Sequence, residues 1–189
     1  CKSDFRSIDV RDTGAIGDSI TVNTSAIQKA IDDLASEGGG TVYIRDGNYV
    51  SGTLRLQSGI TLHIDKGASL LGSVEQEDYT DDIATLTDGI GQQFGHALIY
   101  AADAMNITIT GGGTIDGRGF ESHFSRNRGD KRPSLLRFER VDSLTVKDLN
   151  LTNAAFWVQH YRNSSNILVD SVRVVSHSNG NNDGIDIDG

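Results

Sequence analysis

The sequence is poor in several features that each define a class of protein. Its 189 residues include one cysteine and one proline, and no apolar run is long enough to span a bilayer. A single cysteine excludes a framework of internal disulfides. Basic residues are also scarce, with 17 Lys and Arg against 26 Asp and Glu. The resulting net charge of -9 argues against nucleic acid as the main partner.

The sequence does have a repeated pattern of short apolar strands. Three segments align with one another, residues 106–117, 143–154 and 166–177, and residues 59–64 form an earlier, looser copy. Each of the three holds two short aliphatic runs around a polar corner, and each follows another short strand, at 97–100, 135–138 and 156–161. A spacing of about 23 residues fits one coil of a right-handed parallel β-helix, and wider spacings would hold insertions.

A β-sandwich such as a jelly roll is the alternative, because it also has many short strands separated by turns. Sandwich hairpins are rich in Asn-Gly, Asp-Gly and proline, whereas the corners here are mostly Asx, Ser or a single Gly, and Pro133 is the one proline. The sequence therefore predicts an all-β parallel β-helix over residues 9–189, after a tether at residues 1–8.

A helix is predicted close to the start of the chain. It follows Asn23 or Thr24, either of which can cap it, and it ends at the glycines of residues 38–40. Its apolar stripe consists of Ala26, Ile27, Ala30, Ile31, Leu34 and Ala35. An open first coil would expose core and strand edges, so we expect the helix to cover it.

Cys1 has two interpretations. It is either a chance residue or the lipid-modified first residue of a mature bacterial lipoprotein, with residues 2–4 as the tether. In the second case acyl chains would hold a secreted or cell-envelope protein on a membrane, such as the outer membrane.

Carboxylates are concentrated in residues 181–189. Asp186 and Asp188 flank Ile187, so a strand there would place both acids on one face, with Asp183 at its entrance. Solvated surface acids would give the same alternation. An acid cluster at the point where a loop enters a parallel strand is nevertheless typical of polysaccharide-cleaving sites.

A second charged segment has the opposite sign. Between Gly117 and Pro133, two acids stand against five cations, Arg118, Arg126, Arg128, Lys131 and Arg132. Local positive charge in an acidic protein would attract a polyanion, and we expect Arg126 and Arg128 to contact it. A solvated loop is the alternative. The five histidines show no metal-ligand spacing, and the glycines at 111–113 lack the Lys-Ser/Thr of a phosphate loop, so no metal or cofactor is expected.

Four motifs follow one another along the chain. They are the opening stretch at 12–49, ITGGGTIDGRG at 109–119, FWVQH at 156–160 and NNDGID at 181–186. In this order they resemble glycoside hydrolase family 28, the polygalacturonases and related pectin hydrolases, across essentially the whole chain. The resemblance implies hydrolysis of galacturonic-acid-containing pectic polysaccharide or oligosaccharide.

The resemblance also implies roles for individual residues. The family's first catalytic motif is Asn-Thr-Asp, which makes Asp183 a catalytic carboxylate, Asn181 a substrate contact and Asp186 its neighbour, whereas Asn182 replaces the threonine. His160 and Trp157 align about one coil before Asp186 and Asp183 and would form the floor of the sugar site.

An inverting hydrolase needs a second, opposed carboxylate about 6.5–9.5 Å from the first. The family's later motifs, Gly-Asp-Asp, Gly-His-Gly and Arg-x-Lys, do not occur before Gly189. We therefore expect the N-terminal part of a longer enzyme, inactive by itself and able to self-associate through an open last coil. A non-catalytic β-helix that binds polysaccharide or serves in assembly is the alternative.

Overall fold

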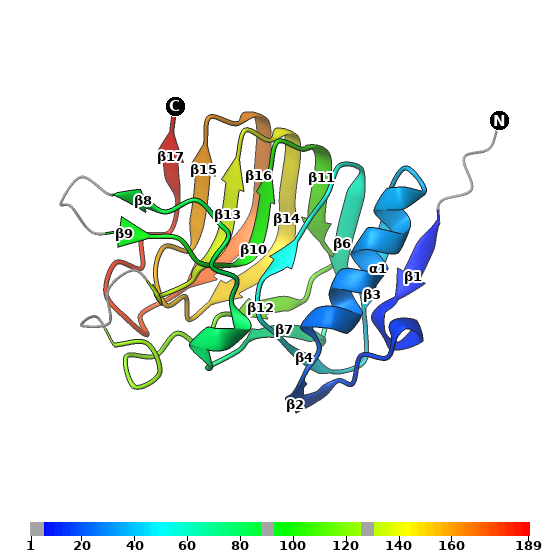
Figure 1. The fold of residues 1–189 in the computed structure, drawn as a ribbon, viewed down its shortest axis with the longest axis horizontal. Coiled ribbons are helices and arrows are strands. Elements are labelled where there is room, and N and C mark those ends of the chain that lie inside the picture. The colour runs from blue at the N-terminus through cyan, green and yellow to red at the C-terminus, as the bar shows by residue number, and fades with distance from the viewer. Residues whose placement is uncertain (1–5, 88–92, 126–130) are drawn as a thin grey trace.

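The chain winds into a stack of coils whose strands lie parallel to those of the coils above and below (Figure 1). The structure, a computed structural model, describes residues 6–87, 93–125 and 131–189. It contains one α-helix, α1 (Thr24–Ser36), and two 3-10 turns, η1 (Val10–Thr13) and η2 (Gln76–Asp78), within these ranges. The strands of the described part are β1 (Ser7–Asp9), β2 (Asp18–Val22), β3 (Gly40–Ile44), β4 (Asn48–Ser51), β5 (Leu54–Arg55), β6 (Ile60–Ile64), β7 (Ser69–Gly72), β8 (Leu86–Thr87), β9 (Gln93–Phe94), β10 (Ala97–Ala102), β11 (Met105–Thr110), β12 (Thr114–Asp116), β13 (Ser134–Glu139), β14 (Asp142–Thr152), β15 (Gln159–Arg162), β16 (Ser165–Val175) and β17 (Asp186–Asp188).

Two parallel sheets form the walls of the stack. Over the described residues, the larger sheet has ten strands in the order β1-β3-β6-β11-β14-β12-β7-β4-β2, with β16 paired to β14. The smaller sheet has the order β17-β15-β13-β10-β5, and β8 and β9 form a separate antiparallel pair. The predicted right-handed parallel β-helix is confirmed. The sandwich alternative is excluded, because its neighbouring strands would run antiparallel.

The strand register contains the predicted repeat. Leu144 of β14 pairs with Ile167 of β16, 23 residues later, and with Ile107 of β11, 37 residues earlier. The wider interval holds an insertion, residues 117–133, between β12 and β13. All three paired side chains point inward, and Ile107 and Leu144 are fully buried.

Residues with positive φ turn the corners of the coils. One corner is made in three successive coils by Asp103, Arg140 and Asn163, with φ of 52°, 51° and 49°. The next corner is made by Asn106, Ser143 and Asn166, with φ of 57°, 60° and 52°. Asn and Asp tolerate this region better than other non-glycine residues, because their short side chains bond locally to the backbone. The corners are therefore mostly polar in the sequence.

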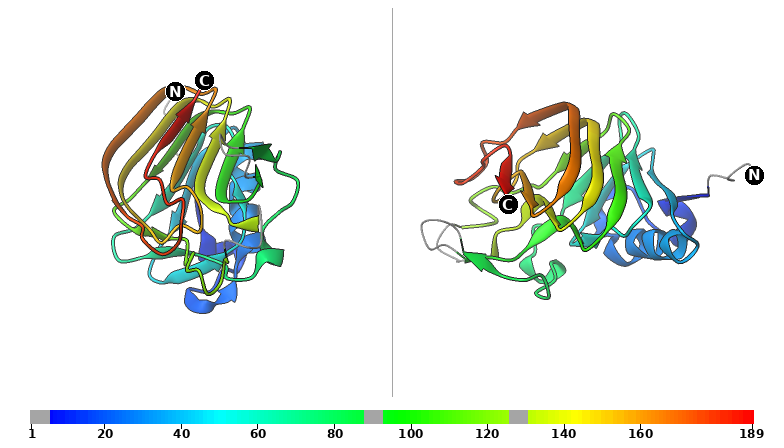
Figure 2. Two further views of the ribbon diagram at one scale, coloured as in Figure 1. Left: turned by 90° about the vertical axis from the view of Figure 1, so that its left-hand side faces the viewer. Right: turned by 90° about the horizontal axis from the view of Figure 1, so that it is seen from above.

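The predicted helix covers the first coil. Ile27, Ala30, Ile31 and Leu34 of α1 are buried in the same core as the inward residues of β3 and β6. Figure 2 shows the helix at one end of the stack and the C-terminal strand at the other. Asn23, one of the two predicted capping residues, occupies the N-cap position, but its side chain makes no capping bond. It instead accepts from the Ile16 amide at 2.7 Å and donates to the Ile16 and Thr21 carbonyls.

The predicted tether is too long. Ser7 and Ile8 belong to β1 and pair with Thr41 and Val42 of β3, because the outer edge of β3 offers backbone groups that a further strand satisfies. Residues 1–5, including Cys1, lie outside the described part, so the lipid anchor stays a prediction. Among the described residues, no helix is both long and apolar enough to cross a membrane.

Burial decreases in the last coil. Val174 of β16 is 37% exposed and Ile187 of β17 is 72% exposed, although their partners Leu151 and Tyr161 in the preceding coil are buried. These two side chains point inward by register but have no further described coil above them.

Candidate active site

The outer face of the smaller sheet carries two rows of polar side chains. The register places Arg137, His160 and Asp186 side by side in one row, and Glu139, Arg162 and Asp188 in the next. The intervening residues point inward, where the rings of Phe138 and Tyr161 stack with centroids 5.7 Å apart. The prediction that Asp186 and Asp188 share a face is therefore confirmed.

Asp183 lies where the loop enters this face. Its side chain is exposed, while its backbone carbonyl accepts a hydrogen bond from the Val158 amide at 2.9 Å. The next carbonyl, that of Gly184, accepts from Gln159 Nε2 at 3.1 Å. The preceding coil thus fixes the backbone of Asp183 and leaves its carboxylate in solvent.

Asp186 occupies a different environment from Asp183. It is partly buried, and its Oδ2 has no hydrogen-bond partner among the described residues. Burial disfavours the charged form, and the nearby carboxylates of Asp183 and Asp188 repel it further, which raises the pKa of Asp186 to about 6. Asp186 can therefore hold a proton in mildly acidic solution beside an exposed carboxylate, an arrangement typical of acid–base sites.

His160 lies beside Asp186 as predicted, but it bonds to Asp188. Its Nε2 is 2.8 Å from Asp188 Oδ2, and the side chain is fully buried. Burial lowers the pKa of His160, and the bond to Asp188 opposes that shift in part. Asp188 was expected only to share a face with Asp186, and no role of its own was predicted for it. The signal was present, because residues two apart on neighbouring strands share a face.

Trp157 is partly exposed at the edge of the site. Its ring stacks on Phe156, with centroids 5.0 Å apart, and meets the His160 ring at a tilt of 66° with centroids 4.9 Å apart. The strand predicted at 156–161 begins only at Gln159. Trp157 therefore lies at the corner before β15, one coil before Asp183, and presents an aromatic surface of the kind that packs against sugars.

The asparagines before Asp183 hold the loop. Asn181, predicted to contact substrate, has a φ of 58°, and its Oδ1 accepts from Arg132 Nη2 at 3.0 Å. Asn182, at the position of the family's threonine, donates from Nδ2 to the carbonyls of Ala154 and Phe156, both at 2.9 Å. The amide at 182 thus fastens the loop to the preceding coil.

The predicted basic segment is divided by the structure. Arg126 and Arg128 lie outside the described residues, and Lys131 is exposed. Arg132 is 2% exposed and bonds to the loop before Asp183, so its expected place among solvent-facing cations is wrong. Arg118 is partly buried and donates from Nε to the Gly72 carbonyl at 2.6 Å.

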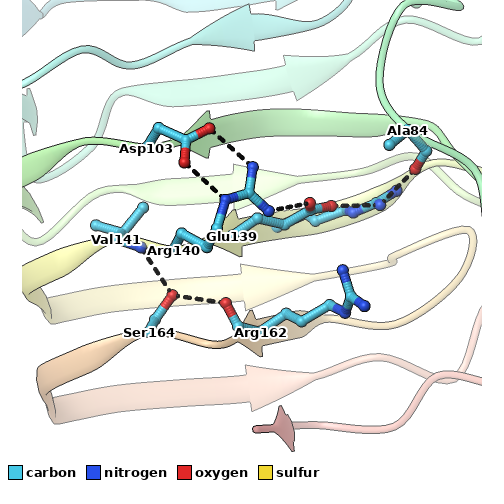
Figure 3. A network of polar contacts seen from close by, with 8 residues as sticks. Ala84, Asp103, Glu139, Arg140, Val141, Arg162 and Ser164 are labelled. Carbon is cyan, nitrogen blue, oxygen red and sulfur yellow. Dashed lines mark hydrogen bonds and ion pairs between the residues drawn. The ribbon is translucent and has the colours of Figure 1, made fainter.

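A buried ionic network next to the site was missed by the sequence analysis (Figure 3). Arg137, 0% exposed, bonds through Nη2 to Glu139 Oε1 at 2.5 Å and to the Ala84 carbonyl at 2.6 Å. Glu139 Oε2 is 3.5 Å from Arg140, which makes two bonds to Asp103, at 2.6 and 2.8 Å. The alternation around Phe138 signals an outward face for Arg137 and Glu139. It does not signal that the segment containing Ala84 covers them.

The described residues offer no metal centre, since no three of their His, Cys, Asp or Glu side chains are placed to hold an ion. The model of the glycosyl hydrolases family 28 matches residues 41–189. The chain belongs to this family.

Relatives agree with the assignment. The chain is 32% identical over 190 residues to a probable polygalacturonase of Vitis vinifera, covering 94% of this chain and 38% of that protein. It is 38% identical over 122 residues to the exo-poly-alpha-D-galacturonosidase of Dickeya chrysanthemi, covering 60% of this chain and 20% of the relative. The family 28 exopolygalacturonase of Yersinia enterocolitica superposes with a TM-score of 0.84 at 28% identity, over 96% of this chain and 41% of that one. The chain thus spans well under half of each relative.

Proposed function

We propose that the whole protein is an inverting glycoside hydrolase of galacturonic-acid-containing pectic polysaccharide, with Asp183 as one of its two catalytic carboxylates. The observation that carries the proposal is the pair of unlike acids at the entrance to β17. Asp183 is exposed on a fixed backbone, and the pKa of Asp186 is raised to about 6. Family membership and the polygalacturonase relatives support the substrate class.

In this proposal Asp183 accepts a proton from the attacking water. Asp186 is too close in the chain to be the opposed acid, because it lies on the same strand entrance and the same face. Its raised pKa lets Asp186 stay protonated in mildly acidic solution, which limits the repulsion among the three acids. The opposed acid is expected from the family's Gly-Asp-Asp motif. The chain spans 38% of the Vitis vinifera relative, so the activity is proposed for the whole protein.

The substrate is proposed to lie over Trp157, which is partly exposed at the edge of the site, whereas His160 is buried and supports the site through its bond to Asp188. Arg126 and Arg128 stay predicted contacts for the uronate carboxylates, with Lys131 as an exposed cation in the same segment. The alternative of a non-catalytic binding module is not favoured, because a simple binding site for a polyanion would not need three carboxylates.

The test is Asp183→Asn in the full-length protein, with Asp170→Asn, an exposed acid of β16, as the matched control. Loss of the base should lower kcat on polygalacturonate by about 10²–10⁴-fold with an unchanged circular dichroism spectrum. Proton NMR of the first product should show inverted anomeric configuration. Wild-type turnover in Asp183→Asn would sink the assignment, and retained configuration would sink the inverting mechanism.

A further inference from the structure

Arg132 is a buried cation that the acid chemistry above does not use. It is 2% exposed and lies directly before Pro133 and β13. Its Nη1 donates to the Gly180 carbonyl at 2.8 Å and to the Ala155 carbonyl at 3.2 Å. Its guanidinium also lies over the Phe156 ring, 4.8 Å from the centroid. Burying a guanidinium is unfavourable unless its donors have hydrogen-bond acceptors. Arg132 therefore favours the arrangement of the surrounding chain that supplies these acceptors.

The same guanidinium bonds to three consecutive residues of the loop before Asp183, residues 179–181. Besides the Gly180 carbonyl, it bonds to Asn179 Oδ1 at 3.3 Å through Nη1 and to Asn181 Oδ1 at 3.0 Å through Nη2. The planar fork of arginine suits this task, because its donors point in fixed directions. A lysine at this position would keep the charge but could not reproduce the separate bonds that Nη1 and Nη2 make to the loop.

Asn181 needs such support because its backbone is in the left-handed region, with φ of 58°. A residue with a Cβ is less favourable in this region than in the right-handed one, although Asn tolerates it better than most residues. The bond from Arg132 holds the Asn181 side chain in this state, only two residues before Asp183. The loop's direction at residue 183 therefore depends on that contact.

Two further side chains, those of Asn179 and Asn182, hold the same loop. Asn179 Nδ2 donates to the carbonyls of Gly119 and Phe124, at 3.1 and 2.7 Å, and Asn182 fastens the loop to the preceding coil. Segments from three different places in the chain thus converge on residues 179–182. Arg132 itself bonds both to the loop and to the Ala155 carbonyl of the preceding coil.

We propose that Arg132 is a positioning residue that sets the orientation of the Asp183 carboxylate by clamping residues 179–181. The effect on catalysis rests on the proposed function, whereas the structural role of Arg132 in holding the loop does not depend on it. Because Arg132 is buried and directed at the loop, it is not a cation that receives a uronate carboxylate of the substrate.

Kinetics of the full-length protein separate these two roles. Arg132→Met and Arg132→Lys are compared with Arg173→Met, which removes an exposed cation of β16. A displaced base should lower kcat about 10–100-fold in Arg132→Met, with KM changed less than about threefold, and Arg132→Lys should fall between it and wild type. A rise in KM alone, reproduced in wild type by added salt, would identify a substrate cation and overturn the proposal.

Hydrogen exchange tests the clamp without any substrate. The amide of Val158 bonds to the Asp183 carbonyl, and that of Asn179 bonds to Asn182 Oδ1. Both should exchange at least about tenfold faster in Arg132→Met, while amides of β14 and the Arg173→Met control stay at wild-type rates. Unchanged exchange at both amides would overturn the proposal.

The two measurements also keep the proposals apart. If wild type fails to cleave polygalacturonate but the two amides lose protection in the variant, the proposed substrate is wrong and the clamp stands. If Arg132→Met does not fold, Arg132→Lys, which retains charge and bulk, decides the question by the same exchange comparison.

Discussion

Two clusters of charged side chains lie on the outer face of the same sheet, but water reaches them differently. In the ionic network, Arg137 and Glu139 of β13 are 0% and 2% exposed beneath the segment that precedes β8. In the acid cluster, two strands further on, Asp183 and Asp188 are exposed and Asp186 is partly buried. Strand register places both clusters outward, whereas the cover above each decides whether a charge requires a partner.

The difference in solvent exposure explains why one cluster pairs opposite charges and the other groups like charges. The covered cluster pairs each cation with an acid, since an unpaired buried charge would be strongly unfavourable. The open cluster leaves like charges together, and burial together with their repulsion raises the pKa of Asp186. We infer that the first cluster serves stability and that the second sacrifices some stability for chemistry.

Arg137→Met should have the largest effect on folding. It leaves the Glu139 carboxylate buried without its 2.5 Å partner, so the free energy of unfolding should fall by about 3–5 kcal/mol. Denaturant unfolding at pH 7 measures this, with Arg173→Met as the control. The double variant Arg137→Met/Glu139→Leu should recover much of the loss. Equal effects in Arg137→Met and the control would remove the distinction between covered and open charges.

Asp186→Asn should stabilise the protein near neutral pH. The folded-state pKa of about 6 lies above the usual 3.8, so ionising Asp186 lowers stability as pH rises from about 4 to about 6. Allowing for solvent screening, the variant should gain about 1 kcal/mol at pH 7 and nothing at pH 3, where the acid is protonated in both states. Unfolding curves at the two pH values, with Asp170→Asn beside them, measure the difference. A gain of the same size at both would show that charge is not the cause.

Asp103→Asn should have the smallest effect of the three. Its ion pair with Arg140 is at the open edge of the covered cluster, where the two side chains are 67% and 46% exposed. Solvent and side-chain entropy reduce the value of such a pair, and salt screens it. We expect a shift in Tm below that of Asp186→Asn, and none in 1 M NaCl. A shift as large as that of Arg137→Met would extend the buried network to this surface pair.

Periodicity predicted much of the fold, because it is a local property of the sequence. The 23-residue spacing between Leu144 and Ile167 indicated one coil, and the alternation around Ile187 placed Asp186 and Asp188 on one face. The caps and tether were harder to predict. Asn23 is a good capping residue, yet its amide bonds to Ile16 and Thr21, because a nearby loop competes for the same side chain.

The sequence predicted the acids of the candidate site but not the residues that hold them in place. Asp183, Asp186 and His160 were named from spacing and motif, and the structure brings them together. The bond between His160 and Asp188 is a diagonal contact, because the register pairs His160 with Asp186 and Arg162 with Asp188. The burial of Arg132 had no sequence signal, since it lies in a segment whose other cations suggested a solvent-facing loop.

The sequence by itself determined the coil repeat, the inward and outward faces of each strand, and the identity of the acids. Those properties depend on neighbours one or two residues away and on a fixed spacing between coils. Only the tertiary structure decided which charges are buried, because Arg132 and Arg137 are covered by segments 48 and 53 residues away. Burial depends on contacts between distant parts of the chain, and those contacts give Arg132 its hold on the loop of Asp183.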